Sequence, residues 1–248
     1  MNPEIISLAK QFHFGVISQN KYTVPKDLTG EEFILDLFRA EAKSREDRAA
    51  ADRLRQAKFP AYKSFDEFDT DFQKGVTSKE LEILAKLEWL ESLYNLILIG
   101  PPGTGKTHMA LAIGNKAARQ GYKVAFTTMD SLVHILKTQE ISVKSQNRLR
   151  WFKKCELLIV DEFGYLPVSR TEANFFFSLI SELYEKSSIV ITSNKGFDGW
   201  AEILGDGVLA TALLDRLTHR CQILNLTGDG WRVAHRKQIF EKKEKGAG

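Results

Sequence analysis

The sequence predicts an α/β protein whose parallel sheet is covered by helices on both faces, and two observations lead to this prediction. Short apolar runs alternate with helical patterns from about residue 76 onward, which is typical of a parallel sheet. One apolar run, residues 96–99, is followed directly by a glycine-rich stretch, residues 100–107, and then by a helical pattern over residues 108–119. A strand, a glycine loop and a helix in this order are the context of a phosphate-binding loop.

The glycine-rich loop fits the pattern G-x-x-x-x-G-K-[ST] and is expected to hold nucleotide phosphates. Its glycines let backbone N–H groups turn toward one anion without Cβ clashes, and the following helix adds the positive end of its dipole. Lys106 places a positive charge on the β- and γ-phosphates, and Thr107 offers a hydroxyl to Mg²⁺. The residues expected to contact the nucleotide are Gly100, Pro101, Pro102, Gly103, Thr104, Gly105, Lys106, Thr107 and His108.

The remaining elements of the sheet domain follow from the same apolar and amphipathic patterns. Helices are expected over residues 78–92, 131–137 and 171–184, and further strands over residues 124–127, 157–160 and 189–192. In such a sheet the ligand binds at the carboxyl ends of the strands. The nucleotide is therefore expected at the edge where the glycine loop begins.

Two of the expected strands end in polar residues at that same edge. Asp161 and Glu162 follow residues 157–160, and Asn194 follows residues 189–192 after one serine. Asp161 would hold Mg²⁺ through its water shell, and Glu162 would orient or deprotonate the attacking water. Asn194 would hydrogen-bond the γ-phosphate or that water, although asparagine after a strand is also common in turns.

Two arginines stand four residues apart beyond the last expected strand. Arg216 and Arg220 would lie on one helix face, and either could reach the γ-phosphate of a neighbouring subunit and supply charge to the transition state. A surface salt bridge with Asp215 or Glu202 is the alternative. The sequence does not choose between the two arginines.

The N-terminal region, residues 1–65, is expected to form a small helical domain in front of a nucleotide-binding domain, residues 66–248. Apolar spacing over residues 33–38 and a helix-start pattern over residues 29–32 predict one long helix. Residues 59–62 contain a proline that ends it. The connector aromatics that follow are expected to pack on the next domain; they are Phe65, Phe68 and Phe72.

Three basic blocks stand out in a chain whose net charge is only +3. Residues 39–63 hold eight basic and four acidic residues, residues 137–154 hold six basic residues against Glu140, and residues 232–245 are again basic. One block alone is better explained as a solvated helix face, but three suggest a polyanion partner. The residues expected to contact double-stranded DNA, largely without sequence preference, are Arg39, Lys43, Arg45, Arg48, Arg53, Arg55, Lys137, Lys144, Arg148 and Arg150.

Composition excludes several other classes of protein. No apolar run approaches the roughly 20 residues of a membrane span, and the first residues show no signal peptide. Cys155 and Cys221 stand far apart, and the five histidines are scattered, so neither disulfides nor a side-chain metal site is expected. We expect a cytoplasmic protein.

Four stretches together resemble the AAA+ ATPases of the helicase-loader clade, and in particular the IstB-type transposition helper ATPases that bacterial insertion sequences encode beside a DDE transposase. The stretches are the phosphate loop, Leu-Leu-Ile-Val-Asp-Glu-Phe-Gly-Tyr, Ile-Thr-Ser-Asn and Leu-Leu-Asp-Arg-Leu-Thr-His-Arg. Residues 59–68 and 87–91 look like that family's connector and lead-in helix. The resemblance therefore spans nearly the whole chain.

The resemblance implies an ATP-dependent, DNA-binding homo-oligomer that captures target DNA and activates or directs a partner transposase. It also implies that the helical insertion around residues 137–154 faces DNA. Carried over residue by residue, it assigns Lys106 and Thr107 to ATP and Mg²⁺, Asp161 and Glu162 to the Walker B roles, Asn194 to sensor 1, and Arg216 or Arg220 to the arginine finger.

One departure from broader AAA+ proteins concerns the C-terminal lid. Only 28 residues follow Arg220, too few for a full helical lid. The resemblance therefore implies a truncated lid, in which Arg232 is the only candidate for a sensor 2 arginine.

Two alternative functions remain open at this stage. A replicative helicase loader shares the same core, but the N-terminal region has no cysteine cluster and its helix is basic rather than an apolar docking face. A small-molecule kinase fits less well, because Glu162 beside Asp161 and the late arginine pair suit hydrolysis in an oligomer.

Overall fold

Five parallel strands form the centre of the protein in the order β2-β3-β4-β1-β5. The computed structural model describes residues 2–25, 28–165, 167–228 and 230–231. The strands are β1 (Asn95–Ile99), β2 (Val124–Thr128), β3 (Leu157–Phe163), β4 (Ser188–Ser193) and β5 (Cys221–Asn225). The expected parallel α/β sheet is thus confirmed, with the strand that precedes the glycine loop next to the strand that ends in Ser193.

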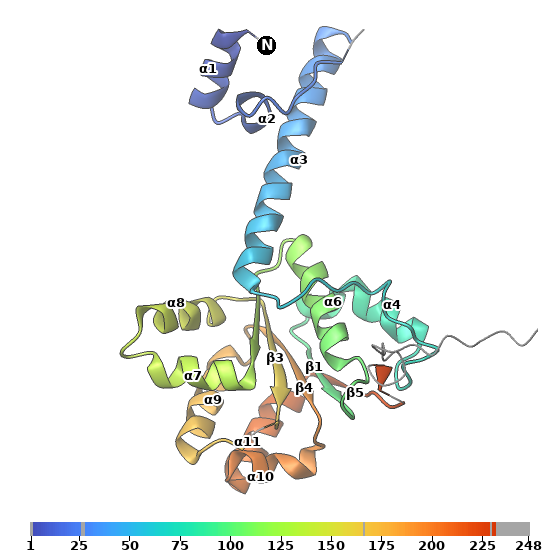
Figure 1. Cartoon of the computed structure of the whole chain (residues 1–248), viewed down its shortest axis with the longest axis vertical. Coiled ribbons are helices and arrows are strands. Elements are labelled where there is room, and N and C mark those ends of the chain that lie inside the picture. Colours follow the sequence, from blue (N-terminus) through green and yellow to red (C-terminus); the bar gives the residue numbers. More distant parts are fainter. Residues whose placement is uncertain (1, 26–27, 166, 229, 232–248) are drawn as a thin grey trace, which may run out of the picture.

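Helices cover both faces of the sheet and bury one apolar core on each side (Figure 1). On one face lie α4 (Ser78–Lys86), α5 (Glu88–Glu91) and α6 (Lys106–Arg119). On the other lie α7 (Met129–Thr138), α8 (Val143–Phe152), α9 (Arg170–Leu183), η1 (Phe197–Gly199), α10 (Trp200–Leu204) and α11 (Gly207–Thr218). Because strand side chains alternate between faces, β1 supplies Leu96 and Leu98 to the first core and Ile97 to the second.

The sequence patterns missed the edge strand β5. It pairs in parallel with β1 and follows the arginine-bearing helix α11. Most of its residues are exposed or half-exposed, and Leu224 is its one buried side chain. An edge strand of this kind lacks the continuous apolar run that marks the inner strands.

The expected helix over residues 78–92 is two helices. Thr77 and Glu80 form a capping box at the start of α4, a common helix-start pattern. Leu87 then adopts φ 64° between α4 and α5, which ends the first helix. Leu87 is 1% exposed, so burial of its side chain opposes the steric cost of this conformation.

A long helix, α3 (Gly30–Ala57), rises from the sheet domain and carries the small helices α1 (Pro3–Gln11) and α2 (Gly15–Ser18) near its far end (Figure 1). Its start has the capping box of Thr29 and Glu32. Within the described ranges, no helix combines the length and apolar character needed to cross a bilayer. The domain boundary proposed near residue 65 falls in the connector between α3 and α4.

Two arginines join the foot of α3 to the sheet domain. Arg148 donates to the carbonyls of Gln56, Ala57 and Phe126 at 2.7, 3.0 and 2.8 Å. Arg53 donates to the carbonyl of Ala118 at 2.7 Å. Because the last carbonyls of a helix lack intrahelical partners and carry its negative dipole end, Arg148 both caps α3 and connects it to β2.

A buried carboxylate holds α2 against α3. Glu41 is 4% exposed, and its oxygens accept hydrogen bonds from the backbone N–H of Val16 at 2.9 Å and from Arg45 at 2.7 Å. Burial raises the pKa of Glu41, but hydrogen bonds from Arg45 and from the amides of Val16 and Gly15 outweigh it and leave the pKa lowered. The N-terminal helices therefore depend on an ionised Glu41.

We expect the contact between α2 and α3 to weaken as pH falls through the lowered pKa of Glu41. A carboxylate with a lowered folded-state pKa contributes its stability above its unfolded pKa of about 4.3 and loses it as the folded-state group is protonated. Glu41→Gln should weaken the contact at neutral pH by about 1–3 kcal/mol, because the donors lose a charged acceptor. Hydrogen exchange of the Val16 amide measures this, and unchanged protection would contradict it. The control is Glu46→Gln, since Glu46 is exposed on the same helix.

Candidate nucleotide-binding site

The glycine loop adopts a conformation that side chains would obstruct. Gly103 and Gly105 have φ 86° and 89°, in the left-handed region that favours glycine. A Cβ at Gly103 would lie 2.9 Å from the Cα of Gly230, and one at Gly105 would lie 2.9 Å from the ring of Phe68. The loop is therefore enclosed both by the chain that precedes it and by the chain that follows β5.

The ammonium group of Lys106 lies over the loop it follows. Its Nζ donates to the carbonyls of Gly100 and Pro101, both at 2.7 Å. Thr104 donates to the same Pro101 carbonyl at 2.9 Å. Because Lys106 is the first residue of α6, its charge and the positive end of the helix dipole act on the same space.

Asp161 joins three elements at the carboxyl ends of the strands. It is 4% exposed at the end of β3, and the hydroxyl of Thr107 on α6 lies 3.0 and 3.1 Å from its two oxygens. The hydroxyl of Thr192 on β4 donates to Asp161 as well. A carboxylate and a hydroxyl this close are oxygen ligands of the kind that Mg²⁺ takes together with waters and phosphates.

Glu162 and Asn194 lie beside Asp161 at the same edge. Glu162 has φ 62° at a register irregularity between β3 and β4, and its backbone N–H donates to Thr192 at 3.0 Å. This turn leaves the Glu162 side chain exposed while its neighbours are buried. The buried Oδ1 of Asn194 has no hydrogen-bond partner among the described residues, so it is available to accept one.

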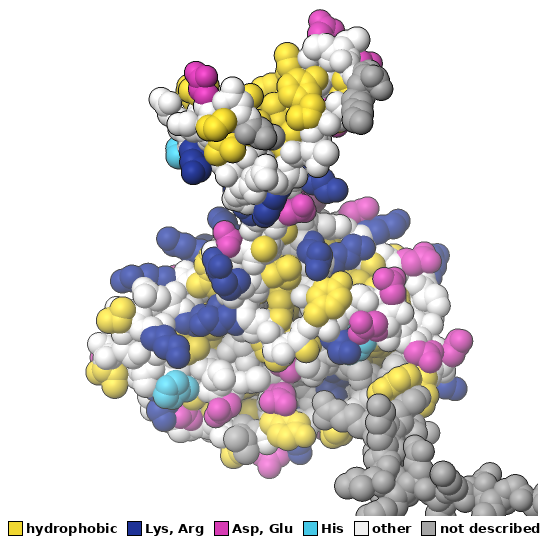
Figure 2. Space-filling view, turned by 45° about the horizontal axis from the view of Figure 1, so that its top comes forward, with side chains coloured by type: hydrophobic (Ala, Val, Ile, Leu, Met, Phe, Trp, Pro, Cys, Tyr) yellow, Lys and Arg dark blue, Asp and Glu magenta, His cyan; other side chains and the backbone are white. Residues whose placement is uncertain are grey.

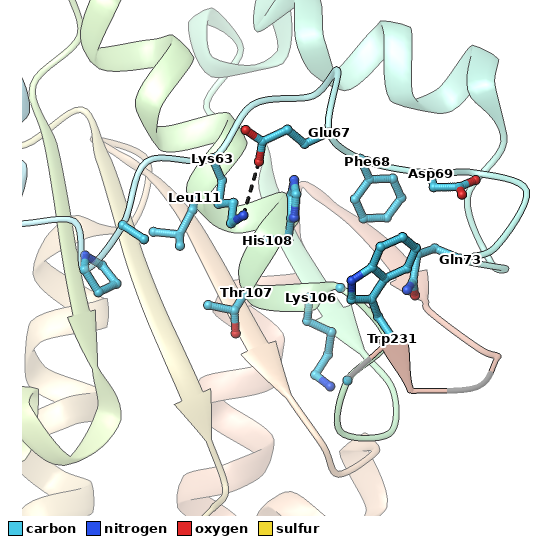
Figure 3. Close-up of a pocket in the computed structure, with 14 residues that line it drawn as sticks. Lys63, Glu67, Phe68, Asp69, Gln73, Lys106, Thr107, His108, Leu111 and Trp231 are labelled. Atoms are coloured by element: carbon cyan, nitrogen blue, oxygen red, sulfur yellow. Dashed lines mark hydrogen bonds and ion pairs between the residues drawn. The ribbon is translucent and has the colours of Figure 1, made fainter. Parts of the chain in front are cut away.

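A cavity of about 590 Å³ opens beside the loop (Figure 3). Phe68, Gln73 and Trp231 lie on one side of it, and Lys63 and Leu111 on the other. The expected packing of the connector aromatics is partly confirmed, since Phe68 is buried in the core and Phe65 is partly buried against it. Phe72 instead makes an edge-to-face contact with Trp231, at 4.9 Å between ring centroids.

The segment after β5 closes the cavity, and the sequence patterns gave no sign of it. Lys74 and Thr227 pair as an antiparallel bridge, and the backbone N–H of Trp231 donates to the carbonyl of Gly103 at 3.1 Å. His108 fixes the connector from the other side, through a contact of 3.0 Å between Nε2 and the carbonyl of Ser64. Arg232, the sensor 2 candidate, and the expected lid lie outside the described residues.

The two candidate arginines lie near the amino ends of the strands, whereas the glycine loop lies at their carboxyl ends. Arg220 directly precedes β5, and its carbonyl accepts from the backbone N–H of Asn95 at the start of β1. Arg216 is one helical turn earlier, with its guanidinium 4.6 Å from the ring centroid of Phe177. Strands of five residues separate these arginines from the glycine loop by about 16 Å.

The basic residues expected to contact DNA divide into two groups. Arg148 is 8% exposed, and its guanidinium donates to three backbone carbonyls, so it is already engaged within the fold. Arg53 is also largely engaged, with a side chain 17% exposed. The remaining eight are exposed or half-exposed, namely Arg39, Lys43, Arg45, Arg48, Arg55, Lys137, Lys144 and Arg150.

The exposed basic side chains gather around the foot of α3 and over α8 (Figure 2). A groove between the end of α3 and α8 is lined by Lys58, Lys144 and Arg148. Burial, followed by the charges of Arg148 and Lys144, lowers the pKa of Lys58. Lys58 is a residue that sequence reasoning did not name, because its neighbours in space are almost 90 residues away.

Comparison with known proteins identifies the family. The model of the IstB-like ATP binding protein family matches residues 13–239. The chain belongs to this family. The family is thus ATP-binding, as the glycine loop predicted.

Named relatives agree with this assignment, and a solved structure shares the fold. The chain is 40% identical over 236 residues to a protein named as a putative ATP-binding protein of insertion sequence IS21 from Pseudomonas aeruginosa, covering 94% of this chain and 89% of that protein. It is 36% identical to the corresponding protein of IS5376 from Geobacillus stearothermophilus, covering 99% of both. The crystal structure of DnaI matches with a TM-score of 0.57 at 20% identity, over 66% of this chain and 91% of that one, which shows that the fold is shared.

We expect Lys106→Ala to fold but to lose ATP affinity by on the order of 10²-fold, because a charged donor to the phosphates is removed. Equilibrium dialysis with ATP measures the loss, and circular dichroism checks the fold. The control is Lys86→Ala, which removes an exposed charge from the last turn of α4. Equal affinity of the parent and Lys106→Ala would contradict this account of the loop.

Proposed function

We propose that this protein is an ATP-hydrolysing regulator of transposition that assembles on target DNA and directs a partner transposase. The observation that supports hydrolysis best is the meeting of Thr107, Asp161, Glu162 and Asn194 at one edge of the sheet. The transposition context rests on relatives along the whole chain that are named for insertion sequences.

In this proposal, different residues at the carboxyl ends of the strands bind the phosphates, hold the metal and activate the attacking water. Lys106 and the loop amides hold the β- and γ-phosphates, and Thr107 and Asp161 would hold Mg²⁺. The metal supplies positive charge that offsets the charge of the triphosphate. Glu162, exposed at the strand end, orients the attacking water and takes its proton, while the unpartnered Oδ1 of Asn194 accepts from that water.

The distance between the glycine loop and the two arginines, Arg216 and Arg220, supports catalysis between subunits. Neither Arg216 nor Arg220 can reach the loop of its own chain across the sheet, whereas head-to-tail stacking would bring these arginines to a neighbour's nucleotide. Arg220 is exposed and donates to the carbonyl of Ser92 at 3.2 Å. Arg216 is held against Phe177. A homo-oligomer is therefore part of the proposal.

We expect Arg216→Ala or Arg220→Ala to lower the ATPase rate by about 10³–10⁵, the range of an arginine finger. Mixing the affected variant with Lys106→Ala subunits should restore part of the rate, because each supplies what the other lacks at a shared interface. Steady-state phosphate release measures both effects. The control is Arg119→Ala, an exposed arginine at the end of α6, and absence of rescue for both arginines would argue against a shared site.

The basic groove at the foot of α3 supports contact with a nucleic acid backbone. Its cations converge from two elements, and repulsion from Arg148 and Lys144 adds to burial in lowering the pKa of Lys58. An anion in the groove would relieve that repulsion. Arg45 and Arg48 are less suitable probes of this contact, because both pair with Glu41. Lys144 and Arg150 on α8 are exposed, and changing them leaves the N-terminal contacts intact.

We expect duplex binding that ATP promotes and salt weakens, with a log–log slope of about −0.9 per phosphate contacted. Duplex binding is compared between two variants in the presence of ATP. Glu162→Gln should bind ATP without hydrolysing it, and Lys106→Ala should remain without ATP. The double change Lys144→Glu and Arg150→Glu should flatten the slope by about one for each phosphate that is no longer neutralised. Fluorescence anisotropy against salt concentration measures this.

The control is Lys79→Glu with Lys86→Glu, which reverses two exposed charges on α4, away from α8 (Figure 1). A salt-insensitive complex, or no complex at any salt, would contradict the DNA-binding proposal. Tighter binding to single strands than to duplex would favour the helicase-loader alternative.

A further inference from the structure

One buried amide in the nucleotide cavity has an unused acceptor. The side chain of Gln73 lines the cavity and is only 4% exposed. Its Oε1 is buried and has no hydrogen-bond partner among the described residues. Buried polar atoms are normally satisfied, so an oxygen of this kind beside a ligand cavity indicates a group that the ligand would supply.

Gln73 is held firmly at this position. Its backbone N–H donates to the carbonyl of Asp69 at 2.9 Å, and the bridge between Lys74 and Thr227 fixes the next residue. A Cβ at Gly105 would lie 3.6 Å from the Cδ of Gln73, so the amide packs against the glycine loop itself. A ligand bound by the loop would bring its next chemical group within reach of this amide.

The walls around the amide suit a flat aromatic ring. Phe68 is buried, and its ring meets His108 edge to face at 5.7 Å between centroids. The indole of Trp231 lies beside Gln73 on the same side of the cavity (Figure 3). Lys106 and Thr107, which face the phosphates in the proposed function, line the same cavity. Its volume of about 590 Å³ falls within the range of small-molecule sites, roughly 300–1,000 Å³.

We propose that Gln73 determines the base specificity of the nucleotide site by reading the 6-amino edge of adenine. An amide presents an acceptor oxygen beside a donor NH₂. This pair matches the 6-amino donor and the adjacent ring-nitrogen acceptor of adenine, the pairing that glutamine makes with adenine elsewhere. Guanine presents two acceptors, O6 and N7, so the buried Oε1 would face another oxygen and stay unsatisfied. This inference rests on the proposed nucleotide site and assigns a specificity residue within it.

Purine riboside triphosphate, which differs from ATP only in lacking the 6-amino group, tests the proposal. The parent protein should bind ATP about five- to tenfold more tightly than this analogue, the worth of one neutral hydrogen bond. Gln73→Met, which keeps the length of the side chain without its polar atoms, removes both hydrogen bonds to adenine and should lower the affinity for ATP by about the square of that factor. It should lower the affinity for the analogue only about five- to tenfold, the worth of the one hydrogen bond from the amide NH₂ to the ring nitrogen, so that the preference for ATP disappears.

Two further variants separate the proposal from a purely structural role. Gln73→Glu keeps the acceptor, so it should bind both nucleotides more weakly through charge repulsion yet still prefer ATP. The matched control is Gln120→Met, at an exposed glutamine directly after α6 that does not line the cavity; it should change neither affinity. Inorganic tripolyphosphate, which the loop alone would hold, should bind the parent and Gln73→Met equally and so reports that the site is folded.

The possible outcomes separate a failure of the role proposed for Gln73 from a failure of the nucleotide site itself. Equal binding of ATP and the analogue by the parent, or equal losses for both in Gln73→Met, would overturn the role of Gln73. If Gln73→Met instead removes a preference of the parent for ATP over 2′-deoxy-ATP, and leaves the preference over the 6-amino-free analogue in place, the amide contacts the ribose. That result would also overturn the proposal. Failure of the parent to bind any nucleotide or tripolyphosphate would instead contradict the nucleotide site itself.

Discussion

The buried carboxylate of Asp161 is the constraint on which the candidate site depends. A carboxylate removed from water must be hydrogen-bonded or paired, and its partners here are the hydroxyls of Thr107 and Thr192. These hydroxyls belong to α6 and β4, so the first turn of α6 and the end of β4 are fixed relative to β3. Thr192 also accepts from the backbone of Glu162. The backbone of Glu162, the proposed catalytic carboxylate, is therefore positioned by the same Thr192 hydroxyl that donates a hydrogen bond to Asp161.

The cavity beside this site is assembled from three stretches that are distant in the sequence. The connector supplies Phe68 and Gln73, the loop supplies Lys106, and the segment after β5 supplies Trp231. The connector and that segment approach so closely that a Cβ at Gly75 would overlap the carbonyl oxygen of Asn225. A nucleotide in this cavity would thus touch the connector, which runs directly from the foot of α3.

The foot of α3 joins the sheet domain at the proposed DNA site through direct contacts. Arg148 binds the last carbonyls of α3 and the carbonyl of Phe126 on β2, and it lies in the groove with Lys58 and Lys144. The same guanidinium therefore anchors the long helix and contributes charge to the basic surface. Loss of Arg148 would disturb both, because three carbonyls would lose their donor.

Local patterns in the sequence determined the inner sheet, the glycine loop and the polar strand ends, because apolar periodicity and φ preferences act within a few residues. They also determined the ATP-binding family. The tertiary structure alone decided three other features. The exposed strand β5 exists because β1 offers a free edge. Arg148 is buried because helix carbonyls 91 and 92 residues away need a donor. Gln73 acquires its significance only when the connector folds onto Gly105. In each case the partner is remote along the chain, and a pattern read over neighbouring residues carries no information about it.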